Sequence, residues 1–93
     1  MRKYELVCVF RQEQDQYTQA KAKVSEHLSK VGAEIKKEED MGERQLAYQI
    51  KKQSRGHYYL WLFTAAPDAI AKLEHELKYV DGILRFLVTR VED

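Results

Sequence analysis

The stretch LAYQIKKQSRGHYYLWLFTA, residues 46–65, predicts a β-hairpin. In its first part large side chains alternate with smaller or polar ones, which places three of them on one face of a strand: Leu46, Tyr48 and Ile50. Residues 51–56 form a polar turn that ends in glycine, and residues 57–65 form an aromatic-rich strand. Because a short turn joins them, the two strands are expected to pair with each other.

The residues before this hairpin predict a strand and then a helix. Residues 3–11 are rich in β-branched and aromatic side chains, as in a strand near the middle of a sheet. Asp15 is a candidate N-cap, and Gly32 offers a C-terminal stop. Between them apolar residues recur at helical spacing: Tyr17, Ala20, Val24, Leu28 and Val31. A charged stretch from Ile35 leads into the hairpin, which predicts a long, bent edge strand.

The residues after the hairpin predict a second helix and a final strand. Pro67 suits the first turn of a helix. The apolar stripe of this helix consists of Ile70, Leu73, Leu77 and Val80. Asp81 and Gly82 form a turn before a strand over residues 83–91.

This order of elements is strand, helix, strand, strand, helix, strand. With right-handed crossovers it predicts an α+β, ferredoxin-like (split βαβ) fold, a four-stranded antiparallel sheet with two helices on one face. The second and fourth strands then lie at the edges of the sheet. The open face and the loops are left for a ligand.

Composition bounds the class of protein. The 93 residues suit one domain, which we expect to span residues 1–93. Residues 34–43 hold five acids against two lysines, whereas residues 44–67 hold four basic residues and no acid, although the net charge is only +1. Glu5 interrupts the apolar start that a signal peptide would have. Cys8 is the one cysteine and cannot form a disulfide within the chain, which favours a reducing compartment. We therefore expect a cytoplasmic protein.

The sequence contains no arrangement typical of an enzyme or a metal site. His75-Glu76 starts like a zinc-protease helix, but Tyr79 stands where the second histidine belongs, and Cys8 and His27 show no ligand spacing. The serines lack a glycine elbow, and there is no phosphate-binding loop or convergent polar cluster for a small molecule. We expect a binding protein with no catalytic residues, no metal and no cofactor.

Aromatic residues in the third strand leave two interpretations open. Residues 55–62 partly resemble the RNP1 signature of RNA-recognition motifs, which would place aromatic rings on the open sheet face to stack bases. The rings concerned are those of Tyr59, Trp61 and Phe63. The favoured interpretation is packing in the core or across strands. A free-standing module that binds single-stranded RNA by stacking on these rings is the alternative function.

Basic residues at the start, around the hairpin turn and on the last strand are candidate phosphate contacts. They are Arg2, Lys3, Lys51, Lys52, Arg55, Arg85 and Arg90. Termini and turns also collect lysine and arginine for solubility, so charge alone leaves RNA binding open.

Several segments together resemble the family of the sixth protein of the bacterial small ribosomal subunit. Arg2-x-Tyr4-Glu5 opens the chain as in that family. Residues 41–50, MGERQLAYQI, match its most recognisable stretch, a glycine, an arginine and Leu-Ala-Tyr-x-Ile. Matching segments follow in order at residues 56–58, 66–67 and 83–85, so the resemblance covers essentially the whole chain.

The resemblance implies a structural component of the small ribosomal subunit, bacterial or organellar. It implies binding to the central domain of small-subunit rRNA, jointly with the eighteenth small-subunit protein, during assembly. Carried over by position, Arg2, Tyr4 and Lys52 match places where family members approach RNA. To these we add four residues from charge and predicted position: Lys51, Arg55, Arg85 and Arg90.

The same resemblance assigns the protein partner to the edge strand. The residues that correspond to the partner-binding segment are Glu39, Arg44, Leu46 and Tyr48. An edge strand has unpaired backbone groups, which suits this role. The chain departs from the family at Met41, where tryptophan or leucine is common, and at Gln49, where proline is usual. The strand over residues 57–66 is one residue longer than usual, which predicts a β-bulge in it.

Overall fold

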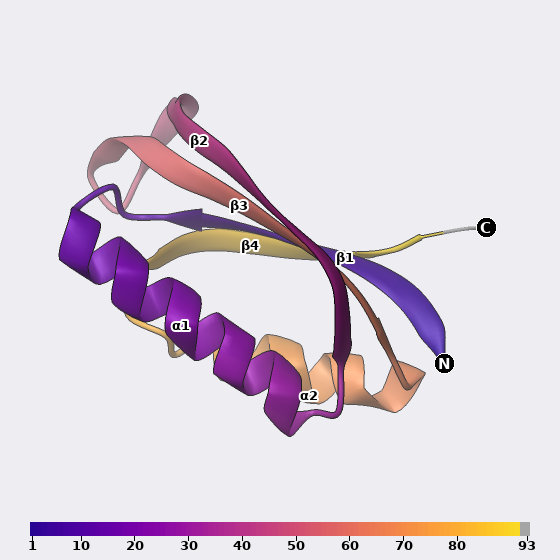
Figure 1. The fold of residues 1–93 in the computed structure, drawn as a ribbon. Helices are drawn as coiled ribbons and strands as arrows, with labels where there is room; N and C mark the ends of the chain where they lie inside the picture. Colours follow the sequence, from indigo (N-terminus) through magenta and orange to yellow (C-terminus); the bar gives the residue numbers. More distant parts are fainter. Residues whose placement is uncertain (92–93) are drawn as a thin grey trace.

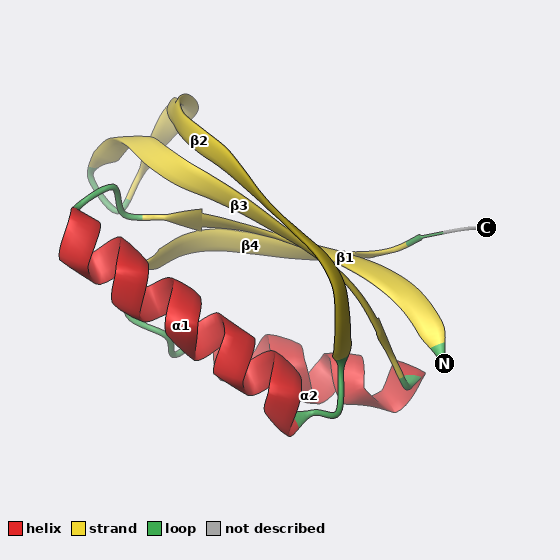
Figure 2. Ribbon diagram, in the orientation of Figure 1, coloured by secondary structure: helices red, strands yellow, loops and turns green. Residues whose placement is uncertain are grey.

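The computed structural model describes residues 1–91 and confirms the predicted ferredoxin-like α+β fold (Figure 1). Its elements are β1 (Arg2–Phe10), α1 (Gln14–Lys30), β2 (Glu34–Ile50), β3 (Gln53–Ala65), α2 (Pro67–Leu77) and β4 (Ile83–Arg90). The strands form one antiparallel sheet in the order β2-β3-β1-β4, so β2 and β4 are its edges, as predicted. Both helices cover one face of the sheet and leave the other open (Figure 2).

The core lies between this sheet and the two helices. Alternate residues of the central strands face it: Leu6, Cys8 and Phe10 of β1, and Tyr59, Trp61 and Phe63 of β3. The favoured interpretation of the β3 aromatics as core residues is therefore confirmed. Alternation with period two follows from the pleat of a strand, in which successive side chains point to opposite faces.

The predicted β-bulge in the third strand is wrong. β1 pairs with β3 without a break, from Arg2 opposite Ala65 to Phe10 opposite His57. In the β2–β3 pairing the register shifts instead lie in β2, between Ile35 and Lys37 and between Asp40 and Gly42, with a further irregularity before Ile50. In the β1–β4 pairing the register shifts between Val9 and Phe10. An edge strand absorbs an extra residue more easily than a strand paired on both sides.

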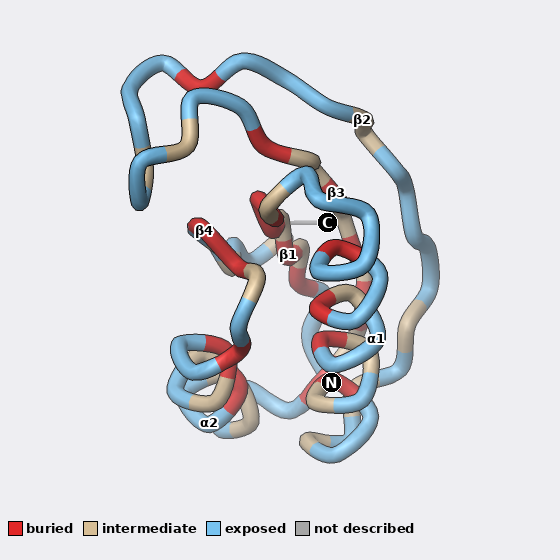
Figure 3. Tube along the Cα trace, turned by 90° about the vertical axis from the view of Figure 1, so that its left-hand side faces the viewer, coloured by how far each residue is buried: buried red, intermediate tan, exposed pale blue. Residues whose placement is uncertain are grey.

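These shifts explain the shape of β2. Gly42 has a φ of +81°, a conformation that glycine adopts without the steric cost of a Cβ. The bulges bend and twist the strand, as the prediction of a long, bent edge strand requires. Figure 3 shows β2 arching away from the helices, exposed along most of its length.

The helices begin and end largely where the sequence predicts. α1 follows Glu13, whose side chain makes no capping hydrogen bond, so the predicted N-cap Asp15 lies inside the first turn. There its carboxylate still interacts favourably with the helix dipole. Gly32, with a φ of +79°, follows the end of α1, and Pro67 begins α2. Neither helix in the described chain has the length and apolar composition needed to cross a membrane.

The hairpin turn is tighter than predicted. Ile50 pairs with Gln53, so the turn consists of Lys51 and Lys52 alone, with φ values of 50° and 66°. Two-residue hairpin turns with positive φ at both positions match the twist of the flanking strands. Residues 53–56, which were predicted as turn, therefore extend β3.

The extended hairpin reaches over the open face of the sheet. There a second, small cluster forms from Val9, Leu46 and Leu84, with Ile50 and Tyr58 against it. Gly56 is buried beside this cluster, where a Cβ would lie 2.5 Å from Val9 Cγ1. The close approach of the strands at this point depends on glycine.

Candidate nucleic-acid and partner interface

Three of the four predicted partner-binding residues are exposed on the open side of β2. Glu39 is opposite Leu60 and Arg44 is opposite Gly56, and directly paired residues share a face of the sheet. The Arg44 guanidinium lies 5.8 Å from the centre of the Tyr58 ring, and its Nε donates to the Met41 carbonyl oxygen at 3.4 Å. These two contacts hold Arg44 on the open face.

Leu46 differs from the other predicted partner residues. It is buried within its own chain, against Val9 and Leu84. Tyr48, two residues further along β2, is 62% exposed. Leu46 therefore anchors the hairpin to the sheet, and Tyr48 is the residue of this pair that can contact a partner.

A row of apolar side chains crosses the open face. Val7 of β1 is directly opposite both Leu60 of β3 and Leu87 of β4. Val7 and Leu60 are half-buried, and Leu87 is 61% exposed. Sequence reasoning missed this row, although the residues between the core positions of each strand could have indicated it. An exposed apolar row on a sheet is typical of a surface that a partner covers.

The cations near the hairpin turn lie beside this row. Lys51 Nζ donates to the carbonyl oxygen of Ile83 at 3.2 Å, which ties the turn to the start of β4. Arg85 of β4 donates through Nη1 to the hydroxyl oxygen of Tyr48. A predicted RNA-binding residue and a predicted partner-binding residue, 37 positions apart in the sequence, are thus in direct contact.

The other cations lie elsewhere. Arg2 is opposite Ala65 and Arg90 is opposite Tyr4, both positions that face the helices, at the far end of the sheet from the hairpin turn. Alternation along β4 therefore puts Arg85 and Arg90 on opposite faces. Arg55 is exposed on β3 near the turn, opposite Gln45, rather than within the turn as predicted. The structure brings Lys51 and Arg85 to the same hollow, with Lys52 as the other residue of the turn, and separates Arg2 and Arg90 from them.

Tyr4, predicted to approach RNA, belongs to the core. Only 7% of it is exposed, and its ring stacks on Phe63 at a centroid distance of 5.7 Å. Tyr59 and Trp61 are buried under the helices in the same way. The alternative of base stacking on these two rings is therefore wrong, because the face of the sheet that carries them is covered.

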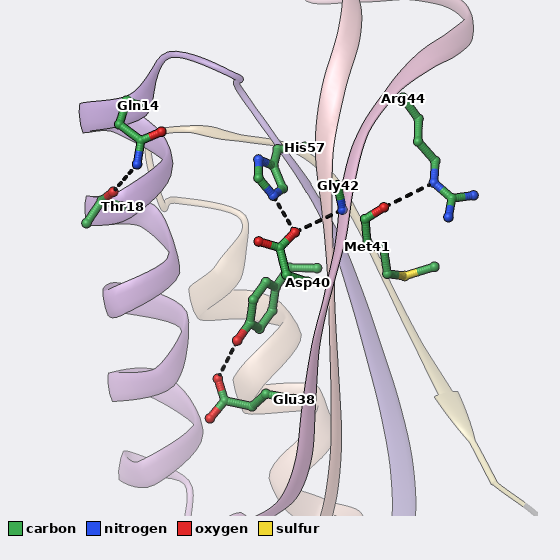
Figure 4. Close-up of polar contacts among 9 residues, drawn as sticks. Gln14, Thr18, Glu38, Asp40, Met41, Gly42, Arg44 and His57 are labelled. Carbon is green, nitrogen blue, oxygen red and sulfur yellow. Dashed lines mark hydrogen bonds and ion pairs between the residues drawn. The ribbon is translucent and has the colours of Figure 1, made fainter.

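A polar network on the helix side fixes the bend of β2 (Figure 4). Asp40 Oδ1 lies 2.6 Å from His57 Nε2 and accepts the Gly42 N–H at 2.9 Å. The hydrogen bond with His57 and then that from Gly42 hold the pKa of the Asp40 carboxyl below its ordinary value. The His57 ring stacks on Tyr17 of α1 at 3.8 Å, and burial raises the pKa of Tyr17 to about 12, with Asp40 adding to the shift.

A second acid of β2, two residues before Asp40, is also hydrogen-bonded within the chain. The Tyr59 hydroxyl donates to Glu38 Oε1 at 2.8 Å, and burial followed by this hydrogen bond raises the pKa of Tyr59. Lys21 Nζ lies 5.0 Å from the centre of the Tyr59 ring. Part of the acidic run of β2 is thus used within the chain. Among residues 1–91, no three His, Cys, Asp or Glu side chains gather as a metal site requires.

Comparison with known proteins decides the family. Residues 3–90 match the family described as Ribosomal protein S6. The chain belongs to the ribosomal protein S6 family. It is 39% identical over 93 residues to small ribosomal subunit protein bS6 of Treponema denticola, with all of both chains covered. It is 38% identical over 96 residues to bS6 of an Exiguobacterium species, with 99% of each covered.

Solved structures agree with this assignment. The crystal structure of 30S ribosomal protein S6 from Thermotoga maritima superposes with a TM-score of 0.88 at 25% identity, over 97% of this chain and 87% of that one. The C-terminal domain of the MgtC protein from Mycobacterium tuberculosis, at 14% identity and a TM-score of 0.67 over 99% of this chain and 89% of that one, shares the fold alone.

Membership of this family confirms three predictions. The chain is a structural protein of the small ribosomal subunit and acts in translation. It is not an enzyme, because ribosomal protein S6 is a structural family. Its relatives are components of bacterial ribosomes, which agrees with the predicted cytoplasmic localisation on the ribosome.

Proposed function

We propose that this chain, acting as one domain of residues 1–93, binds the central domain of small-subunit rRNA jointly with the eighteenth small-subunit protein. The observation that supports this most strongly is the contact between Arg85 and Tyr48. It joins a candidate phosphate contact to the strand that the family resemblance assigns to the protein partner. One continuous surface can therefore bind a protein and an RNA side by side.

The protein partner covers the open face and the β2 edge. Leu87 and Tyr48 are large, exposed and apolar or aromatic, and both lie on this face. β2 also carries the acidic run of residues 34–43, and β2 pairs on one side only. A basic partner would complement the acids, pair with the free backbone groups and remove the apolar row from water.

RNA binds at two places on the chain. Lys51, Lys52 and Arg85 form one group at the hairpin turn, with Arg55 nearby. Arg2 and Arg90 form the second group at the opposite end of the sheet. Two separated groups of cations can hold two RNA segments at a fixed distance, which is the action of an architectural protein. Few contacts and a net charge of +1 give modest affinity without a partner.

A gel-shift titration against a central-domain rRNA fragment, with and without the eighteenth protein, tests this proposal. We expect the partner to raise the affinity for RNA by about tenfold or more, and the affinity to fall as salt increases. Unchanged affinity in the presence of the partner would show that binding is not joint.

Two matched variants examine the coupling. Arg85→Ala removes the guanidinium that touches both surfaces, and we expect it to weaken RNA binding both alone and with the partner. Tyr48→Phe removes only the hydroxyl that Arg85 contacts, and we expect it to reduce the gain from the partner while leaving RNA binding alone intact. Lys72→Ala, an exposed lysine of α2, has the same charge change as Arg85→Ala and is the control.

A further inference from the structure

A polar hollow lies at the end of the molecule where α1 begins, α2 ends and the hairpin turn approaches β4. Its volume is about 720 Å³, within the range of pockets that hold small ligands. Six of its lining residues have cationic, carboxamide or aromatic side chains: Arg11, Gln16, Gln19, Lys51, Lys78 and Tyr79. Of these only Lys51 was a predicted RNA contact.

The floor of the hollow is firmly held. The Arg11 N–H donates to the Gly82 carbonyl oxygen at 2.8 Å, and Lys51 Nζ donates to the Ile83 carbonyl oxygen at 3.2 Å. Gly82 has a φ of +96°, and a Cβ there would lie 2.9 Å from Ala20 Cβ. The turn before β4 therefore packs directly on α1, and the lining residues keep their spacing.

The charge of the hollow selects an anion. Arg11, Lys51 and Lys78 line it against one acid, Asp81. A second hollow of about 280 Å³ shares Lys51 and Lys78 with the first and adds Arg85. Four cations against one acid line this joined groove, whereas the whole chain has a net charge of only +1.

The uncharged residues favour a nucleobase beside the phosphate. Tyr79 is 75% exposed, and its contact with the His75 ring is edge-on, with an interplanar angle of 71°. An exposed aromatic ring is a platform for an unstacked base. Gln16 and Gln19 are exposed on the first turns of α1, and each carboxamide offers a donor and an acceptor to the edge of a base.

We infer that this hollow binds a single unstacked nucleotide of the RNA. Arg11, Lys51 and Lys78 contact its phosphate, Tyr79 stacks on its base, and the glutamine carboxamides hydrogen-bond to the base edge. The inference rests on the proposed RNA binding and extends the group of cations at the hairpin turn, through Lys51, to a site that also includes Arg11, Lys78 and Tyr79. A protein segment is the less suitable occupant, because the cations outnumber the acids four to one in the joined groove.

Affinity for the rRNA fragment, measured in the presence of the partner protein, tests the site. We expect the double variant Arg11→Gln/Lys78→Gln to weaken RNA binding about tenfold. The dependence of its affinity on salt should correspond to about one to two fewer phosphate contacts than in the natural chain. We expect Tyr79→Leu to weaken binding about fivefold or more, and Tyr79→Phe, which keeps the ring, to bind like the natural chain. Ultraviolet irradiation of the natural complex should cross-link Tyr79 to one nucleotide.

The controls separate this inference from the proposed function. Lys72→Ala removes a charge from α2, the helix that ends two residues before Tyr79, and should leave the affinity for RNA unchanged. Absence of RNA binding by the natural chain, with or without partner, contradicts the proposed function itself. Normal RNA binding by the natural chain and equally by the Arg11/Lys78 and Tyr79→Leu variants overturns only the nucleotide site. A loss of partner affinity without a loss of RNA affinity also overturns it, because the hollow would then contact protein.

Discussion

On the sheet face that α1 and α2 cover, Phe10, Trp61 and Phe63 are completely buried, whereas on the other face Val7 and Leu60 are half-buried and Leu87 is largely exposed. The same strands supply both sets of side chains. The covered face contributes to folding, because its apolar area has already left the water. The open face keeps apolar area that only a partner can remove from water.

Polar side chains follow the same division. On the covered side, Asp40 is hydrogen-bonded to His57 and Glu38 to Tyr59, so acids of β2 hold the strand to its own chain. On the open side, Arg44 lies over Tyr58 and Arg85 contacts Tyr48, so cations stand beside aromatic rings at the surface. Substitutions on the covered face, or at the buried cluster of Val9, Leu46 and Leu84, should therefore change stability, and those at exposed positions of the open face should change binding.

The largest expected effect is the loss of stability in Trp61→Ala. The side chain is fully buried against Phe10 and Tyr59, and removing it leaves a large cavity, which costs about 3–5 kcal/mol of unfolding free energy. Urea denaturation measures this. Leu60→Ala, the neighbouring residue on the open face, should cost less than about 1.5 kcal/mol. Equal losses in the two variants would contradict the division between faces.

Gly56→Ala should have the next largest effect on stability. A Cβ would lie 2.5 Å from Val9 Cγ1 and 3.3 Å from the carbonyl oxygen of Phe10, so the Val9 side chain must move and the Phe10 backbone must adjust slightly. Overpacking of this kind costs about 1–3 kcal/mol, again measured by urea denaturation. Ser54→Ala, an exposed change on the same strand, should stay within about 0.5 kcal/mol. Indistinguishable midpoints for the two variants would show that the hairpin adjusts freely.

Leu87→Glu should separate binding from stability. Leu87 is 61% exposed, so we expect a change in unfolding free energy of less than about 1 kcal/mol. On the proposed function, a carboxylate in the apolar row should weaken binding of the eighteenth protein at least tenfold, about 1.4 kcal/mol. Leu87→Met keeps an apolar side chain and should bind normally. Calorimetric titration with the partner measures the affinity of both variants. Normal binding by Leu87→Glu would show that this row is not part of the interface.

The division between faces was partly predictable from the sequence. Helical spacing in residues 17–31 and the aromatic-rich strand of residues 57–65 indicated the elements of the covered face, because burial of many apolar side chains leaves a strong pattern. The order of elements then fixed the topology. The favoured interpretation of Tyr59, Trp61 and Phe63 as packing residues rested on the preference of strands for aromatic side chains, and the structure confirms it.

The open face and the candidate site could not be predicted in the same way. Whether Arg85 meets Tyr48 depends on the bulges of β2 and on a turn of only two residues, and several turn lengths fit the polar stretch of residues 51–56. Tyr4 was placed at the RNA by position in the family, although the pleat turns its ring into the core. Contacts between distant elements set these outcomes, and local sequence carries little information on them.

The smallest expected effect is the loss, as pH falls, of the unfolding free energy that the Asp40 carboxylate contributes. Hydrogen bonds with His57 and Gly42 hold the pKa of this carboxyl below its ordinary value of about 3.9. Its stabilisation is therefore present above about pH 4 and is lost as pH falls through the lower pKa of the folded state. The side chain is 55% exposed, so we expect Asp40→Asn to cost only about 0.5–1 kcal/mol at pH 7.

Urea denaturation of the natural chain and of Asp40→Asn at pH 7 and pH 3 measures this contribution. The gap between the two should narrow at pH 3, because protonation removes the charge from the natural carboxyl as the substitution does. Glu43→Gln, an exposed change on the same strand, should show a smaller gap at pH 7. A gap for Asp40→Asn that stays constant from pH 7 to pH 3 would mean that the shape of the side chain, and not its charge, holds the bend of β2.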